Sequence, residues 1–187
     1  MMDKMTVVLL VALVFLTSCS AYGWKMSESS RMAYEMVDEL TDPYEELYGL
    51  RLSGISEAAP DGKYDNLGMD FHTYRRLSKD EGRRLILKIM DEFLDKINNT
   101  QAFRKHLTVH PFDSNHIVIN IFVKEKEKGE KIFLPDYKSF SIYNEKIYYG
   151  YYLEELGNAV KDKQREMETI EEARRIVESQ NHKINNG

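Results

Sequence analysis

The sequence predicts an α+β fold, in which an antiparallel sheet of about four to five strands has helices packed on one face. Three observations lead to this prediction. Apolar residues recur at helical spacing in several segments, they alternate with polar residues in other short segments, and two of these short segments are joined by a tight polar turn. Consecutive antiparallel strands beside a few helices are typical of α+β proteins.

The first elements expected are a helix over residues 30–40 and a short helical piece from Tyr44 to Tyr48, separated by Pro43. The segment from Leu50 to Gly68 is rich in Gly, Ser, Asp and Pro, so we expect a long loop that is either mobile or functional. Alternation of apolar and polar residues over Leu67 to Thr73 then predicts the first strand.

The clearest element is a long helix that begins after Ser78. Ser78 and Glu81 have the spacing of a capping box, in which each residue hydrogen-bonds the backbone amide of the other. The apolar face of this helix is expected to contain Leu85, Ile86, Ile89, Met90, Phe93, Leu94 and Ile97. Charged residues, including Arg83-Arg84, are assigned to a solvated face. Asn98-Asn99 is expected to end the helix.

The best strand signal is the β-branched run from Ile117 to Val123. A charged loop follows, and residues 132–134 are expected to start a returning strand. The segments 139–143 and 146–153 alternate in the same way, and the short connection Asn144-Glu145 predicts that they form a hairpin.

The carboxy-terminal segment, residues 157–179, is predicted to be a charged helix whose apolar side includes Met167. Residues 180–187 are expected to be a flexible tail. The folded part, residues 31–179, is then a single α+β domain, in keeping with its length.

Composition excludes several classes of function. The 187 residues carry a net charge of −5, which argues against nucleic-acid binding because that function needs a basic surface. A single cysteine leaves no possible disulfide within the chain. The glycine patterns of phosphate- and dinucleotide-binding loops are absent from the sequence, and we expect no cofactor.

The amino-terminal residues have the pattern of a secretory leader. Thr6 to Leu16 is an apolar run that is too short to span a bilayer and matches the core of a signal peptide. The only cysteine, Cys19, follows it closely. The alternatives are an ordinary cleaved signal peptide with an incidental cysteine and an uncleaved amino-terminal helix.

The tetrapeptide Leu16-Thr17-Ser18-Cys19 resembles the lipobox of bacterial lipoproteins. This resemblance implies that residues 1–18 are removed and that Cys19 carries diacylglycerol on its sulfur, usually with an acylated amino terminus, so the protein is anchored in a membrane by lipid. Residues 19–30 would then be a lipidated tether. Ser20 directly after the cysteine implies export to the outer membrane, facing the periplasm. The whole chain is similar to uncharacterised lipoproteins of Gram-negative bacteria.

Tyrosines are concentrated in the predicted hairpin. Alternation places Tyr149 and Tyr151 toward the core, so Tyr148 and Tyr152 point the other way, with Tyr143 nearby. Exposed aromatic rings can bind a peptide or a glycan at a low cost in side-chain entropy. The alternative is that the carboxy-terminal helix covers these rings.

Three histidines, His106, His110 and His116, are candidate metal ligands, although Pro111 and Thr108-Val109 argue against a continuous helix that would bring the first two together.

From the lipobox and the tyrosines we expect a non-catalytic envelope lipoprotein that binds a protein, peptide or envelope polymer through the sheet or the Leu50–Gly68 segment. The alternative is a small metal-binding or hydrolytic envelope protein that uses these histidines.

Overall fold

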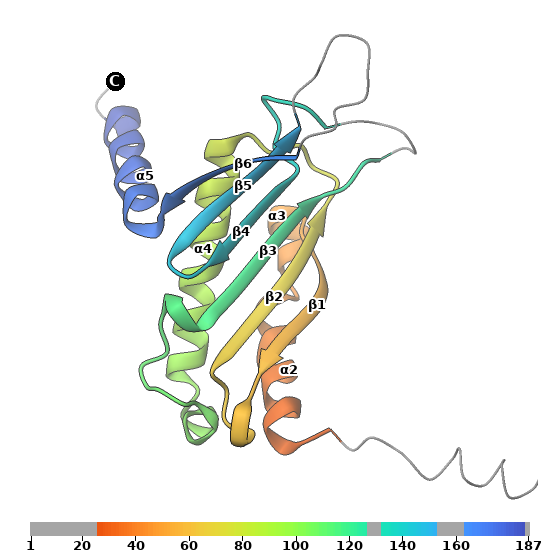
Figure 1. Ribbon diagram of the computed structural model, residues 1–187, viewed down its shortest axis with the longest axis vertical. Coiled ribbons are helices and arrows are strands. Elements are labelled where there is room, and N and C mark those ends of the chain that lie inside the picture. Colours follow the sequence, from red (N-terminus) through yellow and green to blue (C-terminus); the bar gives the residue numbers. More distant parts are fainter. Residues whose placement is uncertain (1–25, 127–131, 153–162, 186–187) are drawn as a thin grey trace, which may run out of the picture.

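The computed structural model describes residues 26–126, 132–152 and 163–185, which form a sheet with helices against it (Figure 1). The helices are α2 (Glu28–Thr41), α3 (Tyr44–Tyr48), α4 (Lys79–Asn99) and α5 (Ile170–Asn185). The strands are β1 (Arg51–Ala58), β2 (Asn66–Thr73), β3 (Ile117–Val123), β4 (Ser139–Tyr143), β5 (Lys146–Tyr152) and β6 (Lys163–Thr169). In this part of the chain, no helix has the length and apolar character needed to cross a membrane.

The strands form one six-stranded sheet in the order β1-β2-β3-β4-β5-β6. All neighbours are antiparallel except β2 and β3, which run parallel because α4 carries the chain back between them. The α+β prediction is therefore confirmed. The expected sheet of four to five strands is wrong in detail, because the sheet has six strands and one parallel pair.

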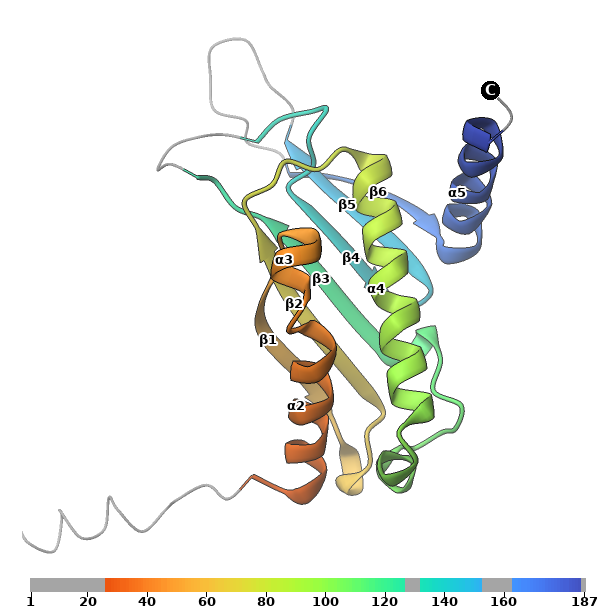
Figure 2. The ribbon, with the colours of Figure 1, turned by 180° about the vertical axis from the view of Figure 1, so that it is seen from behind.

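Helices α2, α3 and α4 lie on one face of the sheet, as the two opposite views show (Figures 1 and 2). Helix α5 contacts α4, β5 and β6, and it lies beyond the β6 edge rather than over the sheet (Figure 1). The opposite face is covered by no helix of the described residues. The prediction that helices pack on one face is confirmed for α2, α3 and α4, whereas α5 packs at the edge of the sheet.

Helix α4 and the sheet make the centre of the core. Ser78 accepts a hydrogen bond from the Glu81 amide, and the Glu81 carboxylate accepts one from the Ser78 amide, so the predicted capping box is present. The predicted apolar residues of α4 are buried, with Leu94 only partly so. Gly82 permits a close approach to the sheet, because an added Cβ would lie 1.9 Å from Cε1 of Phe140.

Two expected boundaries at the amino-terminal side are wrong. Helix α2 begins at Glu28 with Ser27 as its N-cap, inside the segment expected to be a tether. The expected Leu50–Gly68 loop contains β1, which pairs with β2 at the edge of the sheet. Strand β1 lacks a clear apolar alternation because most of its side chains are exposed and a bulge interrupts it between Leu52 and Gly54.

The carboxy-terminal predictions also need correction. Residues 163–169 form strand β6 instead of the predicted helix, which begins only at Ile170 and continues to Asn185 in the expected tail. Residues 132–134 form no strand, and β3 pairs with β4 instead. The residues 127–131 of the charged loop and the predicted helix start at 157 lie outside the described residues.

Candidate binding surface

The β4–β5 hairpin brings the predicted tyrosines together. Asn144 and Glu145 occupy the turn with φ angles of 49° and 57°, the left-handed conformation that two-residue hairpin turns require. The turn places Tyr143 opposite Lys146 and Ser141 opposite Tyr148. The predicted hairpin is confirmed.

The direction of the tyrosine side chains follows from strand alternation. Tyr149 is fully buried against the helices, so Tyr148 and Tyr152, at odd spacing from it, lie on the uncovered face. Both are half-buried, and Tyr143 is 51% exposed. The alternative that the carboxy-terminal helix covers these rings is wrong, because α5 packs beside α4 and beyond the sheet edge (Figure 2).

Neighbouring strands extend this surface. One row of residues crosses the four strands from β3 to β6 in the order Phe122, Ser139, Gly150 and Arg165. Phe122 in this row is 43% exposed. In the next row, Tyr148 is opposite Met167, which is 63% exposed. We call the outward positions of β3, β4, β5 and β6 the open face. Its residues include Phe122, Ser139, Ser141, Tyr143, Lys146, Tyr148, Tyr152, Arg165 and Met167.

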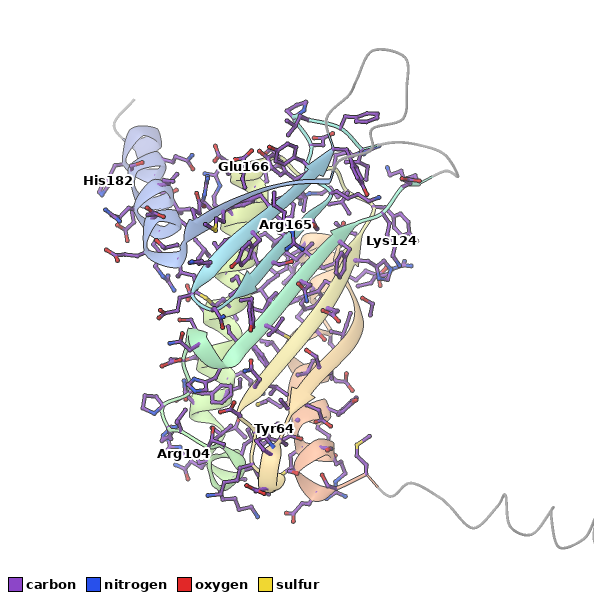
Figure 3. The ribbon with its side chains drawn as sticks, viewed as in Figure 1. Tyr64, Arg104, Lys124, Arg165, Glu166 and His182 are labelled. Atoms are coloured by element: carbon purple, nitrogen blue, oxygen red, sulfur yellow. The ribbon has the colours of Figure 1, made fainter. Side chains whose placement is uncertain are left out.

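Arg165 is the member of the open face that sequence patterning missed, because residues 163–169 were expected to be helical. Its guanidinium carbon lies 5.9 Å from the centre of the Tyr148 ring, within the range of a cation–π contact. Figure 3 shows Arg165 lying over the open face. The contact holds a cation above an aromatic ring on a surface that no described helix covers.

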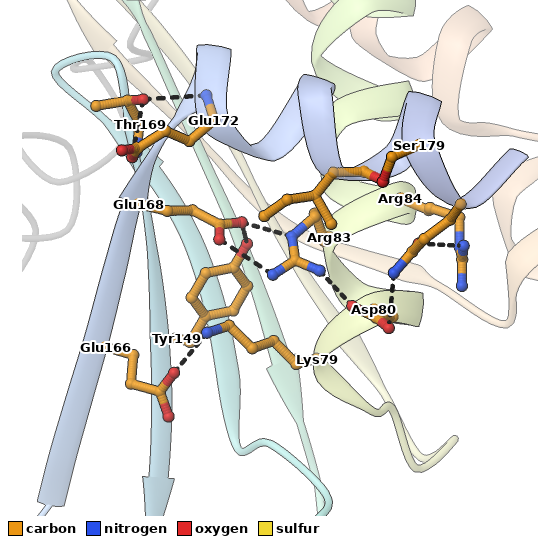
Figure 4. Close-up of polar contacts among 12 residues, drawn as sticks. Lys79, Asp80, Arg83, Arg84, Tyr149, Glu166, Glu168, Thr169, Glu172 and Ser179 are labelled. Atoms are coloured by element: carbon orange, nitrogen blue, oxygen red, sulfur yellow. Dashed lines mark hydrogen bonds and ion pairs between the residues drawn. The ribbon is translucent and has the colours of Figure 1, made fainter. Parts of the chain in front are cut away.

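The inner face of the same edge contains a network of charged groups (Figure 4). Arg83 of α4 is 4% exposed, and its Nε and Nη2 donate to the two carboxylate oxygens of Glu168 at 2.5 and 3.0 Å. Tyr149 donates its hydroxyl to Glu168, and Arg83 also contacts Asp80. The assignment of Arg83 to a solvated face is therefore wrong.

A second pair lies beside the first. Lys79 contacts Glu166 at 2.5 Å, and Tyr137 donates to the same carboxylate at 3.0 Å. The hydrogen bond from Lys79 lowers the pKa of Glu166, with a further contribution from Tyr137. Burial and the neighbouring Glu166 raise the pKa of Tyr137 to about 12. These groups are satisfied by one another, so the network supports β6 and leaves little capacity for an external ligand.

The three candidate histidines are placed differently from one another. His106 is half-buried in a short 3-10 helix, and His110 is exposed in the following loop. Nδ1 of His116 lies 2.9 Å from Oδ1 of Asp113. Across residues 26–126, 132–152 and 163–185, no group of three or more His, Cys, Asp or Glu side chains is arranged to hold a metal ion.

Cys19 and the rest of the lipobox lie outside the described residues, so lipidation stays a prediction. Comparisons of the chain with protein-family models, curated proteins and solved structures found no match.

Proposed function

We propose that the chain is a lipid-anchored, non-catalytic binding protein of the bacterial cell envelope, with the open face as its binding surface. Cys19 holds the lipid, and the Ser20 that follows it favours the outer membrane on its periplasmic side. The observation that carries the binding proposal is the exposure of three large side chains on a sheet face that no described helix covers: Phe122, Tyr143 and Met167 are 43%, 51% and 63% exposed. Large rings exposed on such a face can contact a ligand at a low cost in side-chain entropy.

The chain geometry fits a body held close to a membrane. Only seven residues, 20–26, lie between Cys19 and Ser27, the N-cap of α2. The eight residue-to-residue steps from Cys19 to Ser27 span about 28 Å at most when fully extended. A partner embedded in or close to the same membrane would therefore be within reach of the open face.

The alternative, a metal-binding or hydrolytic protein that uses His106, His110 and His116, has no comparable observation in its favour. His116 is engaged by Asp113, and the described residues contain no metal-type cluster.

The anchor is tested by mass spectrometry of the native protein purified from bacterial membranes, with Cys19→Ser as the matched variant. We expect the native chain to begin at Cys19 and to carry the mass of diacylglycerol and an acyl chain, and we expect Cys19→Ser to lose both the lipid and membrane association. A chain that retains residues 1–18, or an unmodified sulfur at Cys19, would contradict the proposal.

The binding surface is tested by capture of envelope components with the lipidated protein. Tyr143→Ser removes an exposed ring from the open face, and Tyr34→Ser removes an exposed ring from α2 on the other side of the sheet. We expect only Tyr143→Ser to reduce capture. Equal capture by both variants would remove the open face from the proposal.

A further inference from the structure

Charge is distributed unevenly between the two faces of the sheet. Glu166 and Glu168 occupy inward positions of β6, whereas Arg165 occupies an outward position. Lys146 of β5 also points outward, and Lys124, exposed at the end of β3, continues the alternation of that strand. Among the outward strand positions that the structure describes, the only carboxylate is Asp70 of β2.

Asp70 is already engaged. Its Oδ1 accepts a hydrogen bond of 2.7 Å from Nδ2 of Asn120, the residue opposite it on β3. The open face is thus locally basic on a chain whose net charge is −5. The Glu172 carboxylate accepts from Oγ1 of Thr169 at the α5 end of this face. An anion therefore meets cations and hydrogen-bonding groups first over the part of the face around Arg165 and Lys124.

Small residues separate the large side chains of the open face. Ser139 and Gly150 lie in register between Phe122 and Arg165, three inter-strand steps that span about 14 Å. Ser141 lies next to Tyr148 on the neighbouring strand. Flat rings with hydroxyl groups between them suit a ligand that also alternates flat apolar faces with polar edges. The open face lacks the continuous apolar centre of most protein interfaces.

From this combination, and resting on the proposed envelope location, we infer that the open face binds an acidic polysaccharide, a linear glycan that carries carboxylates. Phe122 and Tyr148 stack on sugar rings, Ser139 and Ser141 exchange hydrogen bonds with hydroxyl groups, and Arg165 and Lys146 pair with carboxylates. A single-stranded nucleic acid would meet the same cations, and the envelope location on which the inference rests favours a glycan over it.

The inference is tested by calorimetric titration of the full chain, purified in detergent, with an oligogalacturonate. The comparison ligands are a neutral malto-oligosaccharide of equal length, a single-stranded oligonucleotide and an oligoglutamate. We expect the oligogalacturonate to bind most tightly, with an affinity that falls as salt is raised. No binding of the oligogalacturonate, or tighter binding of the oligonucleotide or the oligoglutamate, would overturn the inference.

Matched variants locate the site. Arg165→Glu and Tyr148→Ala change the open face, whereas Arg31→Glu and Tyr34→Ala make the same changes on α2, where both residues are exposed. We expect the first two to weaken oligogalacturonate binding by about tenfold or more and the second two to leave it unchanged. Arg165→Gln is a milder variant that retains strand geometry, and circular dichroism melting checks that each variant folds. Equal losses in the two sets would refute the assignment to this face.

The outcome separates this inference from the proposed function. Oligogalacturonate binding by a chain that mass spectrometry finds unlipidated would leave the glycan site standing and remove the anchor. A lipidated chain that captures an envelope protein through the open face but binds no acidic glycan would support the proposed function and overturn the glycan inference.

Discussion

Arg83 and Glu168 lie 85 residues apart in the chain and form a bidentate ion pair between α4 and β6, with side chains that are only 5% and 11% exposed. Together with Lys79–Glu166, the pair joins the last strand of the sheet to the helical layer. Its environment is apolar enough that neither charge can be left alone, because an unpaired buried charge carries a large desolvation penalty.

Removing one partner of this pair is therefore expected to be costly. Arg83→Met alone should lower the free energy of unfolding by about 3–5 kcal/mol, because it leaves the Glu168 carboxylate without its cation. Glu168→Leu should cost less, because Arg83 keeps its contact with Asp80. The double variant should recover most of that loss, since two apolar side chains replace both charges. Urea unfolding of the four proteins gives the coupling energy, and simple additivity of the two losses would show that the pair is not coupled.

The acid stability of the protein should depend on Glu166. Lys79, and then Tyr137, hold the pKa of this carboxyl below its ordinary value in the folded chain. A lowered folded pKa contributes stability that is present above the unfolded pKa, about 4.3 for Glu, and is lost as the pH falls through the folded pKa.

We therefore expect the unfolding free energies of the native protein and Glu166→Gln to differ at pH 7 and to converge as the pH falls below about 4. Urea unfolding at a series of pH values measures this convergence. Glu46→Gln makes the same substitution at an exposed carboxyl on α3 and controls for the loss of one negative charge. A difference for Glu166→Gln that does not change with pH would contradict the role given to Lys79.

Gly82 should resist enlargement. Alanine in a helix interior is ordinarily favoured over glycine by about 1 kcal/mol, but a Cβ at this position would lie 1.9 Å from Cε1 of Phe140. Gly82→Ala should thus destabilise the protein by about 1–3 kcal/mol through overpacking.

Gly54→Ala provides the control for this prediction, because the nearest atom to its added Cβ, Oδ2 of Asp70, is 3.8 Å away. The double variant Gly82→Ala, Phe140→Leu should regain part of the loss by making room for the methyl group. Thermal melts give the melting temperatures of the three variants. A higher melting temperature for Gly82→Ala than for the native protein would show that α4 does not approach the sheet so closely.

The turn of the β4–β5 hairpin can be improved. Glu145 has a φ of 57°, a conformation that side chains with a Cβ adopt at a cost, and Asn-Gly is the preferred pair for such a turn. Glu145→Gly should raise the free energy of unfolding by about 0.5–1 kcal/mol. Ser141→Gly, in ordinary strand conformation on the same hairpin, should lower it by a similar amount. Unfolding curves of both variants test the contrast, and a loss at Glu145 would argue against this turn geometry.

Local pattern was enough to predict the elements in which one face is apolar. The stripe of α4, its Ser78–Glu81 capping box and the alternation of β3 each depend on residues close together in the sequence. The hairpin was predictable for the same reason, since Asn144-Glu145 separates two alternating segments. The outward direction of Tyr148 then followed from the period of a strand.

The edge strands were not predictable in this way. Strand β1 is mostly exposed, so its sequence resembles a polar loop. Strand β6 turns Glu166 and Glu168 inward, where an apolar residue would ordinarily be expected, and only Lys79 and Arg83 of a distant helix make those positions acceptable. Arg165 was missed as a surface residue because the strand that presents it was missed.

By itself the sequence determined the amphipathic helices, the central strands, the tight turn and the candidate lipid-attachment residue Cys19, because each is a pattern of neighbouring residues. Tertiary structure decided the parallel pairing of β2 with β3, the inclusion of β1 and β6 in the sheet, and the position of α5 beyond the sheet edge. These features depend on contacts between residues far apart in the chain, and for β6 on the neutralisation of buried charge across such a distance, which no local period records.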